Sequence, residues 1–325
     1  MHLFRRLFAQ TRPAENGMDK PTPTPIPPDN SDPSNIDTSQ LITQEIAFTP
    51  DAPDGVTRPL PQESLMSFLG GDHLIFGQLS DVGVVRSNNQ DAAFSTFSTS
   101  RSAEERPDFG VFIIADGMGG HHDGEKASAM TTRTVASHII SNVYVPMLTG
   151  ANENTMSITE ILVAAAEKAN AEVLAKVPDG GTTLSAVVVI GDLAYVAHVG
   201  DSRIYLQTKD GLEQLTRDHS LVQRLIELDQ LTQEEAAEHP QKNVLYRALG
   251  QSETIEVDTL TRRLPSKARL LLCSDGLWNQ VPERDIQDIV KQGSNPQDSC
   301  NKLVALANKH GGVDNVSVIL LHLPG

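Results

Sequence analysis

Beyond Gly71, short apolar runs alternate with polar turns along the chain, a pattern typical of β-strands joined by tight loops. Turn residues such as Gly191-Asp192 and Asp210-Gly211 separate several neighbouring runs. Connections this short join antiparallel strands. The pattern therefore predicts mostly antiparallel sheet, built from HLIFGQLSDVG, FGVFIIADG, LSAVVVIG, LAYVAHVG, SRIYLQT, ARLLLCSDG and VSVILLHL.

Longer stretches between these runs have a helical period. The apolar faces predicted for EKASAMTTRTVASHIISNV and ITEILVAAAEKANAEVLAK consist of Ala127, Thr131, Val135, His138 and Ile139, and of Ile161, Leu162, Ala165, Ala169 and Val173. Near the end of the sequence, PERDIQDIVKQG and PQDSCNKLVALANKHGG begin with Pro and end on Gly, as helices often do. Because strands and helices come in separate blocks, we predict an α+β fold with helices layered on stacked antiparallel sheets.

The first 70 residues differ in composition from the rest of the chain. From residue 12 onward they are rich in Pro, Ser, Thr, Asp and Asn, with little hydrophobic periodicity. Such a segment cannot offset its ordering entropy by burial. We therefore predict a disordered tail over residues 1–70 and one folded domain over 71–325. An unstructured start is favoured for the first residues. The alternative is contact with an anionic membrane surface, through the apolar Leu3, Phe4, Leu7 and Phe8 and the basic Arg5 and Arg6.

Charge and cysteine content exclude several classes of protein. The formal net charge of the 325-residue chain is -16, which argues against a partner such as DNA. Cys273 and Cys300 are the only cysteines, too few for a disulfide framework, so a reduced cytoplasmic setting is expected. The apolar runs fall far short of the ~18 residues that suggest a membrane span.

Acidic residues lie in turns at the borders of the apolar runs. Each such turn alone is weak evidence, because Asp-Gly is a common turn dipeptide. Together they are harder to dismiss, because burying an unpaired carboxylate is unfavourable and basic residues are sparse beside them. Oxygen-bound Mg²⁺ or Mn²⁺ would compensate the charge, and no Cys/His cluster favours zinc. The turns in question are VRSNNQD, ADGMGG, GDSR, CSDGLW and GGVDNVSV.

The series of motifs resembles the metal-dependent (PPM, or type 2C) protein phosphatase family, and closely its bacterial branch. The resemblance runs from about Leu74 to Leu323 in the family's order. It rests on VGVVRSNNQD, VFIIADGMGGH, GTTLSAVVV, AYVAHVGDSRIYL, LTRDHSLVQRLI, NVLYRALG, LLCSDGLW and GGVDNVSVILL. It implies a four-layer α/β/β/α sandwich with two central antiparallel sheets, and a serine/threonine protein phosphatase that acts on phosphoproteins made by kinases.

The resemblance also implies a site with two cations, Mn²⁺ or Mg²⁺. Asp116 bridges both in this interpretation, and the Gly117 carbonyl joins one. Asp275 and Asp314 complete the other, and Asp91 reaches the site through water. A third metal position is implied at Asp201 with Asp275. Arg86 corresponds to the family's phosphate-binding arginine, whose planar fork can hold two oxygens.

The sequence departs from the family pattern at two positions. Met118 stands where many relatives carry a histidine proposed as the acid for the leaving group. We expect His121 to be the nearest candidate for that catalytic and substrate-binding role, with a loop residue that at most contacts substrate as the alternative. Gln90 stands where many relatives have a glutamate. An amide in place of this charged contact should weaken the metal site without abolishing it.

Residues 219–249 form an amphipathic pair of segments that corresponds to the flap beside the active site in bacterial relatives. A plain surface hairpin is an equally open interpretation. For the whole chain, a catalytically silent binder of phosphoproteins remains the alternative to an enzyme. A phosphatase specialised for one regulator is a third hypothesis, which the core motifs do not separate from a generalist. We expect a monomer that participates in signal transduction.

Overall fold

The structure is a computed structural model that describes residues 73–99, 107–120, 122–150 and 156–325. All of these residues lie in one compact unit, Pro59–Gly325. The predicted tail over residues 1–70 lies outside the described residues. Within the described part of the chain, no helix has both the length and the apolarity that a membrane crossing requires.

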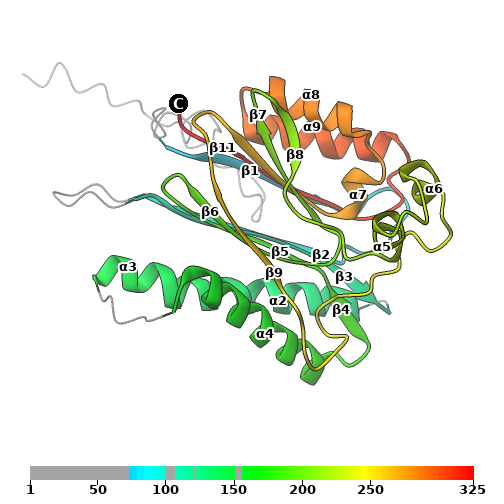
Figure 1. Cartoon of the computed structure of the whole chain (residues 1–325), viewed down its shortest axis with the longest axis horizontal. Helices are drawn as coiled ribbons and strands as arrows, with labels where there is room; N and C mark the ends of the chain where they lie inside the picture. Colours follow the sequence, from blue (N-terminus) through cyan, green and yellow to red (C-terminus); the bar gives the residue numbers. More distant parts are fainter. Residues whose placement is uncertain (1–72, 100–106, 121, 151–155) are drawn as a thin grey trace, which may run out of the picture. The chain divides into compact units, whose positions relative to one another are not determined.

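Two antiparallel sheets form the centre of the unit (Figure 1). The first has the order β1-β11-β10-β7-β8 and the second the order β2-β3-β5-β6-β9, with β4 paired to β3. The first sheet comprises β1 (Ile75–Asp81), β7 (Arg203–Thr208), β8 (Gly211–Gln214), β10 (Arg269–Cys273) and β11 (Val316–His322). The second comprises β2 (Asp91–Ser98), β3 (Phe109–Gly119), β4 (Gly180–Thr182), β5 (Leu184–Ile190), β6 (Leu193–Val199) and β9 (Asp258–Arg263).

Helices cover the outer face of each sheet and complete a four-layer α/β/β/α sandwich, as expected (Figure 1). The second sheet is covered by α2 (Asp123–Ile139), a π-helical turn η2 (Ile140–Tyr144), α3 (Val145–Thr149) and α4 (Ile158–Lys176). The first is covered by α7 (Asp275–Trp278), α8 (Glu283–Gln292) and α9 (Pro296–Lys309). Two short helices, α5 (Leu221–Glu227) and α6 (Gln233–Ala237), lie in the predicted flap segment at one end of the sheets.

Three apolar clusters account for the layering. Phe112, Ile114, Ile204, Leu270 and Leu272 belong to the cluster between the two sheets. The two outer clusters join each sheet to its helices. Alternate residues of β10 therefore face opposite clusters, with Leu271 packed toward the helices, as the period of a strand buried on both faces requires. The strands are thereby fixed, and the loops at their ends are free to carry polar groups.

Truncating the inter-sheet core should lower stability without touching the polar loops. Leu272 is fully buried, so we expect Leu272→Ala to lower the free energy of unfolding by ~2–5 kcal/mol, through lost burial and a residual cavity. Leu228 is 49% exposed, and Leu228→Ala should change that free energy by about 0.5 kcal/mol or less. Denaturant unfolding of both variants measures the difference. Equal losses would contradict the assigned core.

Candidate metal centre

Asp91 and Asp116 lie side by side at one end of the second sheet. The register of β2 and β3 pairs their Cα atoms directly. Thr183 fixes Asp116 on both sides, because its hydroxyl accepts from the Asp116 backbone N–H at 2.9 Å and its own N–H donates to the Asp116 carbonyl at 2.8 Å. The Asp91 carboxylate accepts a hydrogen bond of 2.7 Å from the Ser274 hydroxyl, which belongs to the other sheet's side of the site.

Asp275 and Asp314 reach the same end from the first sheet. β10 and β11 are antiparallel neighbours, so the residues that follow β10 lie near those that precede β11. Asp275 is the first residue of α7, and its carboxylate accepts from the Asn279 amide at 3.1 Å. Asp314 accepts from the Asn315 backbone N–H at 2.9 Å. Consecutive strands thus deliver two carboxylates to one loop cluster.

Two glycines permit the close backbone approach that this convergence requires. A Cβ on Gly117 would lie 2.1 Å from the carbonyl oxygen of Gly124, at the start of α2. A Cβ on Gly276 would lie 2.0 Å from the carbonyl oxygen of Asn315. Both contacts are far inside van der Waals distance, so a side chain at either position would force the backbone apart.

Arg86 lies at the rim of the carboxylate cluster. Its Nη2 donates to the Asp314 carboxylate at 2.7 Å, while its side chain remains 48% exposed. The preceding residues are tied down, because the Val84 and Val85 N–H groups both donate to the Gly312 carbonyl, at 2.8 and 3.1 Å. The guanidinium therefore faces both the carboxylates and solvent, the position from which an incoming anion can be bound.

Asp201 occupies the turn between β6 and β7 and is 6% exposed. The Trp278 indole N–H donates to its backbone carbonyl at 3.0 Å. Burial raises the pKa of Asp201 well above its ordinary value, and the charges of Asp275 and Asp218 raise it further, against a lowering contribution from Arg203. Asp201 and Asp275 are therefore close enough for their charges to interact.

The carboxylates raise one another's pKa. Burial raises the pKa of Asp91 to about 7, with contributions from Asp275 and Asp314. Burial, then Asp91, Asp275, Asp201 and Asp314, raises that of Asp116 far above its ordinary range. For Asp275, burial and Asp314 raise the pKa to about 6 against a hydrogen bond with Asp116. Negative charge is therefore unfavourable at Asp91, Asp116 and Asp275 in the absence of a further cation.

The residues present fit a hard cation. The donors are carboxylate oxygens, and Asp91 Oδ1 is buried without a hydrogen-bond partner. Within the described ranges, no three or more His, Cys, Asp or Glu side chains converge on a single point that could hold a metal. Mg²⁺ does not require such a cage, because it is commonly held by one or two carboxylates and retains several waters. Asp116, whose pKa the charge of Asp275 raises, and Asp275 itself are two carboxylates that could supply these oxygens.

The predicted acid His121 lies outside the described residues. Met118 is half-buried within β3. The side-chain amide of Gln90 donates to the Gly119 carbonyl at 3.5 Å. The Gln90 backbone carbonyl accepts from Gly117 N–H at 3.1 Å and from the Ser128 hydroxyl at 2.5 Å. Gln90 therefore contributes to the site mainly through its backbone.

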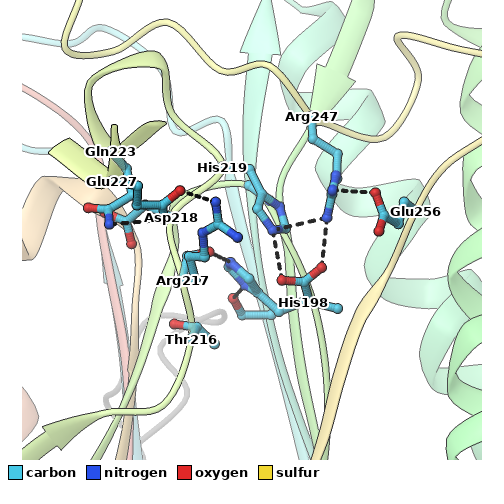
Figure 2. Close-up of polar contacts among 12 residues, drawn as sticks. His198, Thr216, Arg217, Asp218, His219, Gln223, Glu227, Arg247 and Glu256 are labelled. Atoms are coloured by element: carbon cyan, nitrogen blue, oxygen red, sulfur yellow. Dashed lines mark hydrogen bonds and ion pairs between the residues drawn. The ribbon is translucent and has the colours of Figure 1, made fainter. Parts of the chain in front are cut away.

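The flap segment is closed at its two ends by one buried imidazole (Figure 2). The Gly200 N–H donates to His219 Nδ1 at 3.0 Å, so Nε2 carries the proton and donates to Asp258 at 3.1 Å. From the far end of the flap, Arg247 donates to the same Asp258 at 2.7 Å, and the Tyr246 N–H donates to the His219 carbonyl at 2.9 Å. Thr232 and Glu235 form a capping box at the start of α6.

A second tie links the flap entrance to Asp201. Arg203 forms a bidentate pair with Asp218, with Nε and Nη2 at 3.1 and 2.7 Å from its carboxylate oxygens. The same guanidinium lies 3.7 Å from the centre of the Trp278 ring, whose indole holds Asp201. Stacking and bidentate pairing together fix the guanidinium, and with it the first residue of β7.

Sequence reasoning missed the residues that hold the loops together. Asn315 donates through Nδ2 to the Val82 and Asn88 carbonyls, both at 2.9 Å, and its Oδ1 accepts from the Gln90 N–H at 2.8 Å. The family motifs select its neighbour Asp314 as a metal ligand. They give no role to Asn315, because an Asn after an Asp is an ordinary turn signal. Ser274 bridges the two sheets, because its hydroxyl donates to Asp91 and accepts from the Ser317 N–H.

Comparison with known proteins identifies the family. The family model "Protein phosphatase 2C" matches residues 84–308. The chain is 35% identical over 248 residues to the serine/threonine phosphatase Stp of Listeria welshimeri, covering 74% of this chain and 93% of the relative. This chain belongs to the protein phosphatase 2C family.

Solved structures of bacterial phosphatases have the same fold. The serine/threonine phosphatase of S. agalactiae superposes with a TM-score of 0.66 at 34% identity, covering 77% of this chain and 100% of its own. The catalytic domain of PstP, solved in complex with two manganese ions, superposes with a TM-score of 0.63 at 31% identity, covering 78% and 99%. The expected fold and family are confirmed.

Acid should destabilise the domain through His198, which is 1% exposed beneath the flap entrance (Figure 2). Its Nε2 donates to the Arg217 carbonyl at 3.0 Å, and burial, then His219, lowers its pKa to about 3. A pKa depressed below the ordinary 6.5 means that the neutral ring stabilises the fold above pH ~6.5. This stability is lost as the pH falls toward 3, by up to ~1.4 kcal/mol per pH unit.

The measurement is the free energy of unfolding in urea between pH 7 and 5, for the native chain and for His198→Asn. The variant should be less stable at pH 7 and should show a shallower fall with acid, by up to one proton's slope. Identical slopes would mean that His198 is not a buried neutral ring.

Proposed function

We propose that this chain hydrolyses phosphoserine and phosphothreonine in proteins, with Mn²⁺ or Mg²⁺ held by Asp116, Asp275 and Asp314. The observation that carries the proposal is the set of carboxylates that raise one another's pKa beside an exposed guanidinium. Divalent cations would relieve this repulsion, and the family and the PstP structure solved with two manganese ions support the same chemistry.

The proposed ligand set follows the loop positions. Asp116 would face both core cations, the Gly117 carbonyl would join one of them, and Asp275 with Asp314 would complete the other. Asp91 would hold bound water, consistent with its unpartnered Oδ1. Asp201 with Asp275 would hold a third cation. Bound cations would lower the pKa of water and neutralise charge on the phosphoryl oxygens.

The side chains of the protein perform the remaining work. Arg86 would leave Asp314 in part to bind two phosphoryl oxygens, orienting the phosphorus toward the carboxylate cluster. Asp91 would orient bound water through its carboxylate, which accepts hydrogen bonds. Protonation of the leaving serine or threonine oxygen is assigned to His121 or to water. Positioning and charge neutralisation provide most of the rate enhancement in such displacements.

A catalytically silent phosphoprotein binder is the weaker alternative, because binding alone would not require this complete carboxylate set. The proposal extends to substrates phosphorylated by serine/threonine kinases, a role in signal transduction, and a monomer in the cytoplasm. The two free, buried cysteines, Cys273 and Cys300, are consistent with a reducing compartment.

Hydrolysis of p-nitrophenyl phosphate tests the metal mechanism. We expect Mn²⁺ to stimulate the reaction. Chelator or Asp116→Ala should lower kcat by on the order of a thousandfold, because the developing charge loses its stabilisation. Glu238→Ala is the matched control, because it removes an exposed carboxylate of the flap segment, and it should retain activity. Activity that survives both chelator and Asp116→Ala would refute the mechanism.

Glycine substitutions separate the geometry of the loops from their charge. Gly276→Ala forces a methyl group into the Asn315 carbonyl, so we expect Asp275 to be displaced and kcat to fall by about tenfold or more. Gly120 has no heavy atom within 4 Å of the added Cβ, and Gly120→Ala should keep kcat within about twofold. Circular dichroism and kinetics on both variants provide the comparison. Equal activity in the two would show that close approach at Gly276 is not needed.

A further inference from the structure

A cavity of 720 Å³ opens at the far end of the first sheet from the carboxylate cluster. It is lined by the end of β7, the β7–β8 turn, the loop before β10, Arg269 at the start of β10 and Lys291 at the end of α8. Arg269 and Asp275 are six residues apart, so at ~3.3 Å per residue along a strand the two sites are separated by roughly 20 Å. The cavity is therefore distinct from the candidate metal centre.

Positive charge predominates in this cavity although the chain is strongly acidic. Its lining contains five basic residues, Lys209, Arg262, Lys267, Arg269 and Lys291, and two acidic ones, Asp210 and Glu213. Glu213 is engaged with Arg262 at 2.5 Å. Among the described residues, no ion pair involves the three lysines. In a chain of net charge -16, a cavity with this balance favours an anion.

A row of polar side chains crosses the strands at this end of the sheet. The strand registers pair Gln207 with Arg269 and Arg269 with His322, so the three side chains share one face. Gln207 lines the cavity and is 4% exposed, yet its Oε1 has no hydrogen-bond partner. His322 is 9% exposed, and its Nε2 also lacks one. Two unsatisfied buried polar atoms in one row are unfavourable unless a ligand or water satisfies them.

Arg269, at the centre of the row, lacks a carboxylate partner within the described part of the chain. It is half-buried, and its guanidinium donates to the Val290 carbonyl at the end of α8. Burial lowers its pKa, and no neighbouring acid raises it. Burial and the charge of Arg269 lower the pKa of His322 to about 4, so that ring is neutral at pH 7. A bound anion would relieve the desolvated guanidinium.

We propose that this cavity binds a small hydroxyl-bearing phosphate ester, of the sugar phosphate type, free or within a nucleotide. The phosphate meets Arg269, Lys267 and Lys291, and a ligand hydroxyl donates to the unpartnered Gln207 Oε1. The volume lies within the range of about 300–1,000 Å³ typical of small-molecule sites. The site is independent of the phosphatase reaction proposed above.

Titration calorimetry on the full chain tests the site, with EDTA present to remove divalent cations. The probes are ribose 5-phosphate, ADP and inorganic phosphate. We expect ribose 5-phosphate or ADP to bind at least tenfold more tightly than inorganic phosphate. Ribose 5-phosphate binding without ADP binding assigns a free sugar phosphate, and the reverse assigns a nucleotide.

Variants locate the binding. The double substitution Lys267→Ser with Lys291→Ser should weaken it at least tenfold. The matched control, Lys302→Ser with Lys309→Ser on exposed positions of α9, should leave it unchanged. Arg86→Ala should also leave it unchanged, which separates this site from the metal centre.

Three results would overturn the proposal. These are no binding of any probe at millimolar concentration, loss of binding in Arg86→Ala but not in the cavity double variant, and inorganic phosphate binding as tightly as the esters.

Discussion

Repulsion among carboxylates is the constraint around which this domain is arranged. Asp91, Asp116, Asp201, Asp275 and Asp314 come from both sheets, and the charges of the other four all raise the pKa of Asp116. No fold would gather them for stability alone, because like charges in a region of low polarity are unfavourable. The apolar clusters between and outside the sheets provide the stability that offsets this repulsion. A cation is the partner that such an arrangement calls for.

The convergence depends on backbone contacts more than on side-chain pairs. Antiparallel pairing of β2 with β3 and of β10 with β11 brings the loops to one end, and Gly117 and Gly276 let them touch. Asn315 then ties the Arg86 loop to the Asp314 loop. On the flap side, His219 and Arg247, near the two ends of the flap segment, both donate to Asp258. Of these strands, β10 also contributes to the second, cationic cavity at its opposite end, through Arg269.

Much of this could be predicted from the sequence. The strands buried on both faces, such as VSVILLHL, are visible as apolar runs, and the acidic turns mark the loops that meet. The edge strand β9 escaped prediction because DTLTRR is mostly exposed and lacks a continuous apolar run. The roles of Asn315, Ser274 and the row from Gln207 to His322 also escaped, because each arises from contacts between residues distant in the chain. Period and turn composition report local structure, and these contacts depend on strand register.

The most direct test of the account is the stability of Asp275→Asn with and without Mn²⁺. Removing one of the mutually repelling charges, without changing the shape of the side chain, should raise the free energy of unfolding in chelator by on the order of 1 kcal/mol. The same substitution should abolish the stabilisation that Mn²⁺ gives the native chain. A variant that is less stable in chelator, and still stabilised by Mn²⁺ as the native chain is, would contradict the claim that Asp275 belongs to a cation site.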